Sequence, residues 1–328
     1  MNPYARLVSL LDDGTPCCVL LVLSAEGSTP REAAVRAVVE VDGTIHGTIG
    51  GGTVEARAQA AAVEACRTGV PAVLDIELTG DAVGDAEPVC GGRMRVLVDP
   101  TAAKDRAAYA RAAEALARRE CGALITAIEA GDVARTRVRW AREEELSAVT
   151  EASEALVEPV VPDPRLIIAG GGHIGQALAR QAALLGFEVL VVDDRPEFAD
   201  PALYPAEATT ICGDTAETLR ALPLAEDSYV VIVTRGHRHD QEALRACVQR
   251  PHAYLGMIGS RRKVALLRAS LLQEGAATEE EFAAIHAPIG LDLGAETVPE
   301  IAASIAAQLV AVRRRGPAAR GARDMRDR

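Results

Sequence analysis

Residues 165–194 read RLIIAGGGHIGQALARQAALLGFEVLVVDD, and this stretch constrains the fold more than any other. An apolar strand leads into a glycine turn, a helix follows, and a second apolar strand ends at Asp193, about twenty residues beyond the turn. The glycines of the G-x-G-x-x-G pattern are Gly170, Gly172 and Gly175. In dinucleotide-binding units the first turns the chain, the second lets backbone amides approach a phosphate, and the third lets the helix pack on the strand. The stretch predicts a Rossmann-like unit, and a unit that has lost its nucleotide would keep the same pattern.

The same turn predicts a place for a ligand. The N-terminus of the following helix favours an anion, and His173 lies where it would contact a phosphate. A histidine is unusual at this position, which leaves room for a phosphorylated ligand other than a dinucleotide.

Two domains are expected in this chain of 328 residues. Short apolar runs at 166–169, 189–192, 209–212, 229–233 and 253–258 alternate with helical segments, which is typical of a doubly wound, mainly parallel sheet. The earlier runs at 17–23, 35–41, 73–78, 94–98 and 124–128, with helices at 54–67 and 104–119, indicate an α+β domain. The proline-rich segment EPVVPDPRL separates them, so we expect domains at 1–160 and 161–314 and a flexible tail at 315–328.

Composition limits the partners. A net charge of −12 argues against nucleic acid and anionic membranes, both of which are bound through a positive field. No apolar stretch is long enough to span a bilayer and the N-terminus does not resemble a signal peptide, so we expect a cytoplasmic protein. The seven cysteines are expected to be reduced, and all except Cys90 to be small core residues.

The segment TRGHRHD follows the fourth strand of the second domain and concentrates polar residues there. Arg235, His237, His239 and Asp240 lie within six positions. Two histidines and an aspartate could bind a transition metal, but the neighbouring arginines oppose a cation, and we assign no metal. Asp240 could instead cap the next helix. Because ligands of open α/β sheets bind outside the carboxyl ends of the strands, we favour hydrogen bonding from Arg235 and His237 to an anion.

A second basic cluster, GSRRK, follows the fifth strand. Ser260 is a candidate N-cap, which places Arg261, Arg262 and Lys263 in the first helical turn. Cations there oppose the helix dipole at a cost of about 0.3 to 1 kcal/mol each. We therefore expect a negative ligand to compensate them, with a solvated basic face as the alternative.

The first domain offers two further candidates. Gly50, Gly51 and Gly52 stand immediately before a helix and could form an anion-binding turn or serve hairpin geometry alone. Cys90 lies in VCGGRMRV, where Arg93 and Arg95 could lower its thiol pKa. It is the candidate reactive thiol, with a buried inert thiol as the alternative; no other catalytic residue is assigned.

With these residues in view, the chain resembles the XdhC/CoxI family of accessory proteins for xanthine dehydrogenase and related molybdenum hydroxylases. The resemblance rests on GSTPRE, GTIGGGTVEA, CGGRM, GGGHIGQAL, VDDRPEF, VTRGHRHD, YLGMIGSRRK and IHAPIGLDLGAETVPEIAASI, in this order. It implies a chaperone that binds molybdenum cofactor (molybdopterin), supports its sulfuration by a cysteine desulfurase, and delivers it to the apo-hydroxylase. One departure is Ala34, where related sequences tend to have glycine; alanine restricts the backbone there.

Two questions stay open at this point. The alternative function is an NAD(P)-dependent oxidoreductase, with Asp193 on the adenosine ribose and His237 or His239 as a proton relay. A homodimer is also expected. The helix TVPEIAASIAAQLVAV carries a capping box from Thr297 to Glu300, and its stripe of Ile301, Ile305 and Leu309 is either core or a dimer seam.

Overall fold

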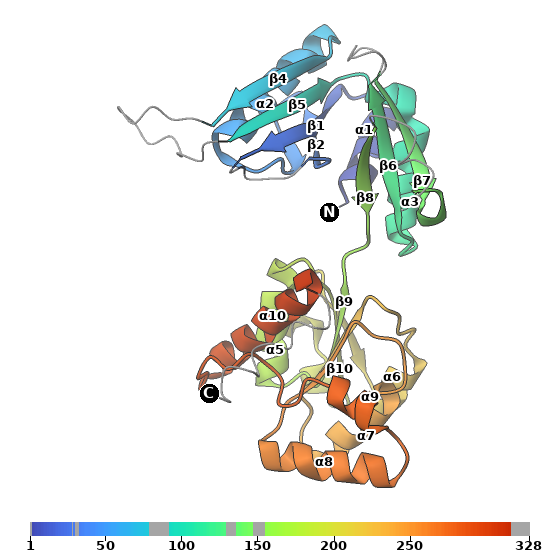
Figure 1. The fold of residues 1–328 in the computed structure, drawn as a ribbon, viewed down its shortest axis with the longest axis vertical. Coiled ribbons are helices and arrows are strands. Elements are labelled where there is room, and N and C mark those ends of the chain that lie inside the picture. Colours follow the sequence, from blue (N-terminus) through green and yellow to red (C-terminus); the bar gives the residue numbers. More distant parts are fainter. Residues whose placement is uncertain are drawn as a thin grey trace. The chain divides into compact units, whose positions relative to one another are not determined.

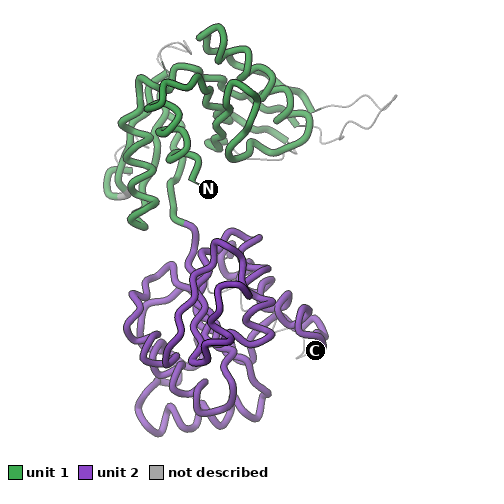
Figure 2. Tube along the Cα trace, turned by 180° about the vertical axis from the view of Figure 1, so that it is seen from behind, with its two compact units in different colours: residues 1–162 green, residues 163–328 purple. Residues whose placement is uncertain are grey.

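The structure is a computed structural model that describes residues 2–27, 29, 33–78, 92–128, 136–146 and 155–315. The chain forms two compact units, residues 1–162 and 163–328 (Figure 2). The change of unit falls within the segment that contains Pro159, Pro162 and Pro164. Within the described residues, no helix combines the length and the apolar character that crossing a membrane requires.

The first unit contains two antiparallel sheets and their helices (Figure 1). The larger sheet has the order β3-β2-β1-β5-β4 and the smaller one β7-β6-β8. The strands are β1 (Cys17–Glu26), β2 (Arg36–Glu40), β3 (Ile45–Gly47), β4 (Ala72–Glu77), β5 (Arg93–Asp99), β6 (Gly122–Ile128), β7 (Thr136–Arg142) and β8 (Leu156–Val160). The helices are α1 (Pro3–Asp12), α2 (Gly52–Thr68) and α3 (Arg106–Ala117), with short 3-10 turns η1 (Ala102–Asp105) and η4 (Glu143–Glu145).

Strand β1 is buried on both faces and organises this unit. Its residues Cys18 and Leu20 pack with Ala58 of α2, whereas Cys17 and Val19 face the cluster that contains α1 and α3. Strict alternation along the strand divides the core into these two layers. The sequence pattern predicts an α+β domain here, and the structure confirms it.

A buried ion pair connects the two sheets of the first unit. Arg36 of β2 donates from Nε to Glu158 of β8 at 2.6 Å, and its other guanidinium nitrogens donate to Tyr109 and Thr126, each at 2.9 Å. Tyr4 of α1 donates to the second oxygen of Glu158 at 2.7 Å. All these groups are buried and satisfied, which is the condition under which a buried charge pair is tolerated.

The second unit is a five-stranded parallel sheet with the order β11-β10-β9-β12-β13. Its strands are β9 (Arg165–Ala169), β10 (Glu188–Asp193), β11 (Thr209–Cys212), β12 (Ser228–Ile232) and β13 (Tyr254–Met257). Its helices are α5 (His173–Leu184), α6 (Thr215–Ala221), α7 (His237–Cys247), α8 (Arg261–Gln273), α9 (Glu279–Ala284) and α10 (Val298–Arg315), with 3-10 turns η5 (Pro196–Phe198) and η6 (Pro201–Leu203). The predicted Rossmann-like sheet is therefore confirmed.

Helices cover both faces of this sheet. Leu178 of α5 and Ile305 and Leu309 of α10 pack in one buried cluster, and α6, α7 and α8 contribute to the cluster on the other face. Ile305 and Leu309 are fully buried, so the stripe that could have been a dimer seam belongs to the core. Glu300 accepts a hydrogen bond from the Thr297 amide at 2.9 Å, as the expected capping box requires of its glutamate.

Some elements differ from the sequence-based expectation. The pattern does not predict α1, β3, β7 or β8, and the predicted helix at 104–119 begins as a 3-10 turn before α3. Short or edge strands with alternating charge, such as TRVRWAR in β7, give little apolar signal on their own.

The described cysteines are free thiols, but they are not uniformly core residues. Cys121 and Cys212 are exposed, so that part of the prediction is wrong. Cys17, Cys18 and Cys247 are buried, and burial raises the pKa of the Cys17 thiol to about 11 and that of Cys247 to about 12. These two thiols are therefore protonated and unreactive at neutral pH.

Ala34 occupies a backbone conformation that favours glycine. Its φ is 62°, and its amide donates to Val22 O at 2.8 Å where β1 meets the turn into β2. A left-handed conformation costs a residue with a Cβ about 1 kcal/mol. The resemblance to related sequences makes glycine the expected residue at this position, and the backbone conformation supplies the reason.

We predict that Ala34→Gly raises the free energy of unfolding of the first unit by up to about 1 kcal/mol, because strain at Cβ is removed. Urea denaturation followed by circular dichroism measures the change. Ala33→Gly, one residue earlier and without a positive φ, is the matched control and should be neutral or destabilising. Equal effects of the two substitutions would contradict the assignment of strain to Ala34.

Candidate functional site

The glycine turn after β9 is shaped by close backbone contacts. Gly170 has a φ of 117°, and a Cβ there would lie 2.5 Å from Val233 O, in the loop that follows β12. A Cβ at Gly175 would collide with Gly170 O. At Gly172, by contrast, a Cβ would meet nothing within 4 Å. The first and third glycines are thus required by packing, while the second borders open space where a ligand could approach.

The start of α5 presents unpaired backbone amides beside that open space. Gly172 is the N-cap, and His173 is the first helical residue and is exposed. Within the described chain, no acceptor is assigned to the amides of His173 and Ile174, which belong to the first turn of the helix. This arrangement can bind an anion through backbone donors and the helix dipole.

Both carboxylate oxygens of Asp193, at the end of β10, accept hydrogen bonds from other groups of the protein. One carboxylate oxygen accepts from the Gly171 amide at 2.8 Å and from the Arg195 side chain at 3.0 Å. The other accepts from the Arg195 amide at 3.0 Å and from Arg195 Nε at 2.9 Å. Burial opposes ionisation, but the hydrogen bonds from Arg195 and Gly171 outweigh it and lower the pKa of the carboxyl. A ribose hydroxyl could reach Asp193 only by displacing Arg195.

The loop after β12 lies against the glycine turn. Gly170 approaches Val233 and Thr234 at the point where β9 has β10 on one side and β12 on the other. In open α/β sheets this change of direction is where ligands bind. Arg235 of this loop and His237, the first residue of α7, are both exposed, and Arg235 donates to Asp194 at 2.7 Å. The structure thus brings the TRGH segment next to the turn.

Asp240 is not a helix cap, so that alternative is wrong. Helix α7 begins at His237 with Gly236 as the N-cap, and the Asp240 side chain is fully buried. Its carboxylate accepts from the Thr234 hydroxyl at 2.6 Å and forms an ion pair with Lys263 of α8. Asp240 therefore connects the loop after β12 to the start of α8 through a hydrogen bond and an ion pair.

This pairing also corrects the interpretation of GSRRK. Ser260 is the N-cap of α8, as predicted, and its hydroxyl accepts from the Lys263 amide at 3.3 Å. The anion that compensates Lys263 is Asp240, because α7 and α8 pack side by side. Arg261 and Arg262 are exposed, and no ion pair is assigned to either within the described residues. These two arginines remain available to an external anion.

The glycine triplet of the first unit forms a separate turn. Gly50, Gly51 and Gly52 all have positive φ, and Gly51 is the N-cap of α2. Glu55 in the first turn accepts from the Thr48 hydroxyl at 2.6 Å and from the Ile49 amide at 3.1 Å. The Glu55 carboxylate thus accepts from the donors that immediately precede the glycine triplet.

The remaining candidate, Cys90, lies outside the described residues, as do Arg31 and Glu32 of GSTPRE. Among the residues that the structure describes, no group of three His, Cys, Asp or Glu side chains is arranged to hold a metal ion. Sequence reasoning missed Asp194 and Thr234; their place at the ends of β10 and β12 was the available signal.

Comparisons with known proteins match both units. A family model described as the XdhC Rossmann domain matches residues 166–309, and one described as the XdhC and CoxI family matches residues 10–77. An uncharacterized Escherichia coli (strain K12) protein, YqeB, is 30% identical over 97% of this chain, which spans only 47% of that protein. A Bacillus subtilis (strain 168) protein, named as a probable subunit of xanthine dehydrogenase, is 24% identical over 96% of this chain and 98% of its own length.

A solved structure has the same fold. The crystal structure titled as a xanthine dehydrogenase from Bacillus halodurans superposes with a TM-score of 0.79, covering 96% of each chain at 24% sequence identity.

We predict that Lys263→Met destabilises the second unit by about 3 to 5 kcal/mol, since it leaves the Asp240 carboxylate buried without its cation. Thermal and urea unfolding measure the loss. Arg261→Met, two residues earlier and exposed, should change stability by less than about 0.5 kcal/mol. The double variant Lys263→Met, Asp240→Asn should recover part of the loss; strict additivity would contradict direct pairing.

Asp193 predicts a specific acid sensitivity. Because its pKa is lowered in the fold, its contribution is present above the unfolded pKa of about 4 and is lost as the pH falls through the folded value. Asp193→Asn should therefore be less stable near neutral pH. As the pH falls below about 4, the free energy of unfolding of the variant should fall less steeply than that of the unchanged protein. The two slopes should differ by up to about 1.4 kcal/mol per pH unit. Unfolding free energies from pH 7 to about pH 3 test this; parallel curves would rule it out.

Proposed function

The chain belongs to the XdhC and CoxI family, and on that premise we propose that it is an accessory protein that matures a xanthine dehydrogenase-like molybdenum hydroxylase. Its cargo would be molybdenum cofactor. The protein would hold the cofactor while a cysteine desulfurase supplies sulfur, and would then deliver it to the apo-hydroxylase. The chain would act as a homodimer. The Bacillus subtilis relative is named for xanthine dehydrogenase, which supports an association with that enzyme class.

One observation carries the proposal: cationic side chains and backbone amides lie at the carboxyl edge of the parallel sheet. Arg235 pairs with Asp194, whereas no ion pair is assigned to Arg261 or Arg262 in the described chain. The turn at Gly172 and the start of α5 supply amides, the loop after β12 supplies Arg235, the start of α7 supplies His237, and α8 supplies Arg261 and Arg262. Direct contacts connect these segments, through Gly170 with Val233 and through Asp240 with Lys263. In a chain with a net charge of −12, such a concentration of donors favours a bound anion.

Molybdopterin suits these groups chemically. It carries a phosphate, which a helix N-terminus binds through backbone amides, and arginines bind phosphate oxygens in bidentate geometry. The oxo groups of its metal centre accept hydrogen bonds, which exposed His173 and His237 could donate. In the first unit, the turn at Gly51 and Gly52 offers a second set of amides, although Glu55 already accepts from the Ile49 amide just before it.

The hydrogen bonds of Asp193 weigh against the oxidoreductase alternative. A dinucleotide-binding carboxylate must accept from the ribose hydroxyls, whereas both oxygens of Asp193 already accept from Arg195. Nucleotide binding would therefore require Arg195 to move away from Phe198, over whose ring its guanidinium lies at 3.8 Å.

We predict that His237→Ala lowers the amount of molybdopterin that co-purifies with the protein by about tenfold, since one exposed donor at the site is lost. The protein is produced in cells that make the cofactor, and bound pterin and molybdenum are quantified per chain. Arg238→Ala is the matched control: Arg238 is the next residue and is exposed, but it pairs along the helix with Glu242 at 3.0 Å. Its retention should equal that of the unchanged protein.

The same preparation separates the two functions. Co-purified molybdopterin, together with loss of hydroxylase activity when the protein is deleted from its host, supports maturation. Absence of molybdopterin combined with intact hydroxylase activity would overturn the proposal. Calorimetric titration with NADH and NADPH tests the alternative, for which micromolar affinity and turnover are required.

A further inference from the structure

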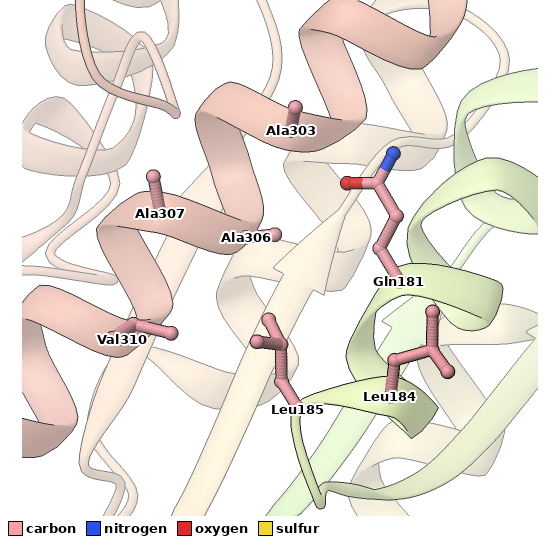
Figure 3. Close-up of a pocket in the computed structure, with 7 residues that line it drawn as sticks. All are labelled: Gln181, Leu184, Leu185, Ala303, Ala306, Ala307 and Val310. Atoms are coloured by element: carbon pink, nitrogen blue, oxygen red, sulfur yellow. The ribbon is translucent and has the colours of Figure 1, made fainter. Parts of the chain in front are cut away.

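An apolar groove lies between α5 and α10, on the second unit. It has a volume of about 480 Å³ and is lined by Gln181, Leu184, Leu185, Ala303, Ala306, Ala307 and Val310. Figure 3 shows these residues along the two facing helices. Leu184 has 89% of its surface exposed, more than any other large hydrophobic residue of the described chain. Isolated exposed leucines are ordinary, but one at the edge of an apolar groove indicates a surface that another molecule covers.

The exposed face of α10 has a regular order of side chains. Glu300, Ala303, Ala307, Val310 and Arg314 follow one another at spacings of three and four residues, so they share one face of the helix. Glu300, Ala303 and Arg314 are exposed and Ala307 and Val310 are half-buried. The opposite face, with Ile305 and Leu309, is already buried in the core. This outer stripe is therefore distinct from the one that the sequence suggests as a seam.

The charges on this stripe are placed symmetrically. Glu300 and Arg314 lie equally far from Ala307 along the chain, which corresponds to about 10 Å on either side at 1.5 Å per residue. Glu300 accepts from the amides of Glu296 and Thr297 through one carboxylate oxygen, and its side chain is exposed. No ion pair within the described chain engages Arg314.

We infer that this stripe and the groove beside it form the interface between two copies of the chain, with the two α10 helices antiparallel about a twofold axis near Ala307. In this arrangement Glu300 of each copy faces Arg314 of the other, and the alanines let the helix backbones approach closely. The apolar middle of the stripe, together with Leu184, covers the groove. The inference does not depend on which ligand the protein binds.

A second copy fits this surface better than a different partner does. An interface between identical surfaces must be complementary to itself, and a stripe with an acid at one end and a base at the other meets this condition only when antiparallel. A partner protein of one charge sign would repel one of the two ends. The symmetry of the charges about Ala307 thus favours a second copy over a partner of uniform charge.

Sedimentation velocity of the full chain tests the interface by charge reversal. Arg314→Glu places two acidic side chains against each other at both ends of the stripe, and the dimer dissociation constant should rise at least about tenfold. Glu300→Arg should have the same effect through paired basic side chains. An equimolar mixture of the two variants should restore a dimer, because the mixed pair has opposite charges at both ends. Arg315→Glu, adjacent and exposed but off the stripe, is the matched control and should remain dimeric.

Ala307→Glu provides an independent variant, since it places like charges against each other at the axis without touching the Glu300 cap. Circular dichroism confirms that each variant is folded. A monomeric unchanged protein at about 50 µM, equal effects of Arg314→Glu and Arg315→Glu, or failure of the mixture to dimerise would overturn the inference. A monomeric variant that retains molybdopterin would leave the proposed cofactor binding intact, so cofactor binding and the interface are tested separately.

Discussion

The geometry of the candidate site depends on one buried carboxylate, that of Asp240. It is fully buried, and it survives there because Thr234 and Lys263 satisfy it from two different segments. Since an unpaired charge at this depth would cost several kcal/mol, neither segment can move away independently. The loop after β12 already touches the turn at Gly170. The ion pair and this contact together hold the glycine turn, the loop after β12 and the start of α8 relative to one another.

The same principle recurs elsewhere and explains which charges remain free. The Asp193 carboxylate accepts hydrogen bonds from Arg195 and Gly171, and the Glu158 carboxylate accepts them from Arg36 and Tyr4. Buried carboxylates thus pair with arginines within the fold. The arginines left over at the sheet edge, Arg261 and Arg262, are those with no structural partner assigned in the described chain. An acidic protein can in this way present a locally cationic site.

Much of the site was predictable from residues 165 to 194 alone, because strand, glycine turn and helix are local features with their own periodicity. The N-cap at Ser260 was predictable for the same reason, because it is set by neighbours within a few residues. The unusual backbone at Ala34 was indicated only by the family resemblance. The partner of Lys263 was not, since Asp240 lies 23 residues away in sequence and meets it only when α7 packs beside α8. The alternative of Asp240 as a helix cap fails because α7 begins three residues earlier, at His237, and the carboxylate pairs with Lys263 instead.

The parallel sheet, its glycine turn and the position of donors at the carboxyl ends of the strands follow from the residues alone, because periodicity and strand order carry that information. Which of those charges pair inside the fold depends on contacts between distant segments. The tertiary structure assigned Asp193 to Arg195 and Lys263 to Asp240, and it turned one face of α10 inward while leaving Ala303 and Arg314 outside. The physical reason is common to all three: burial must satisfy every charge and every apolar face, and the partners that do so come from distant parts of the chain.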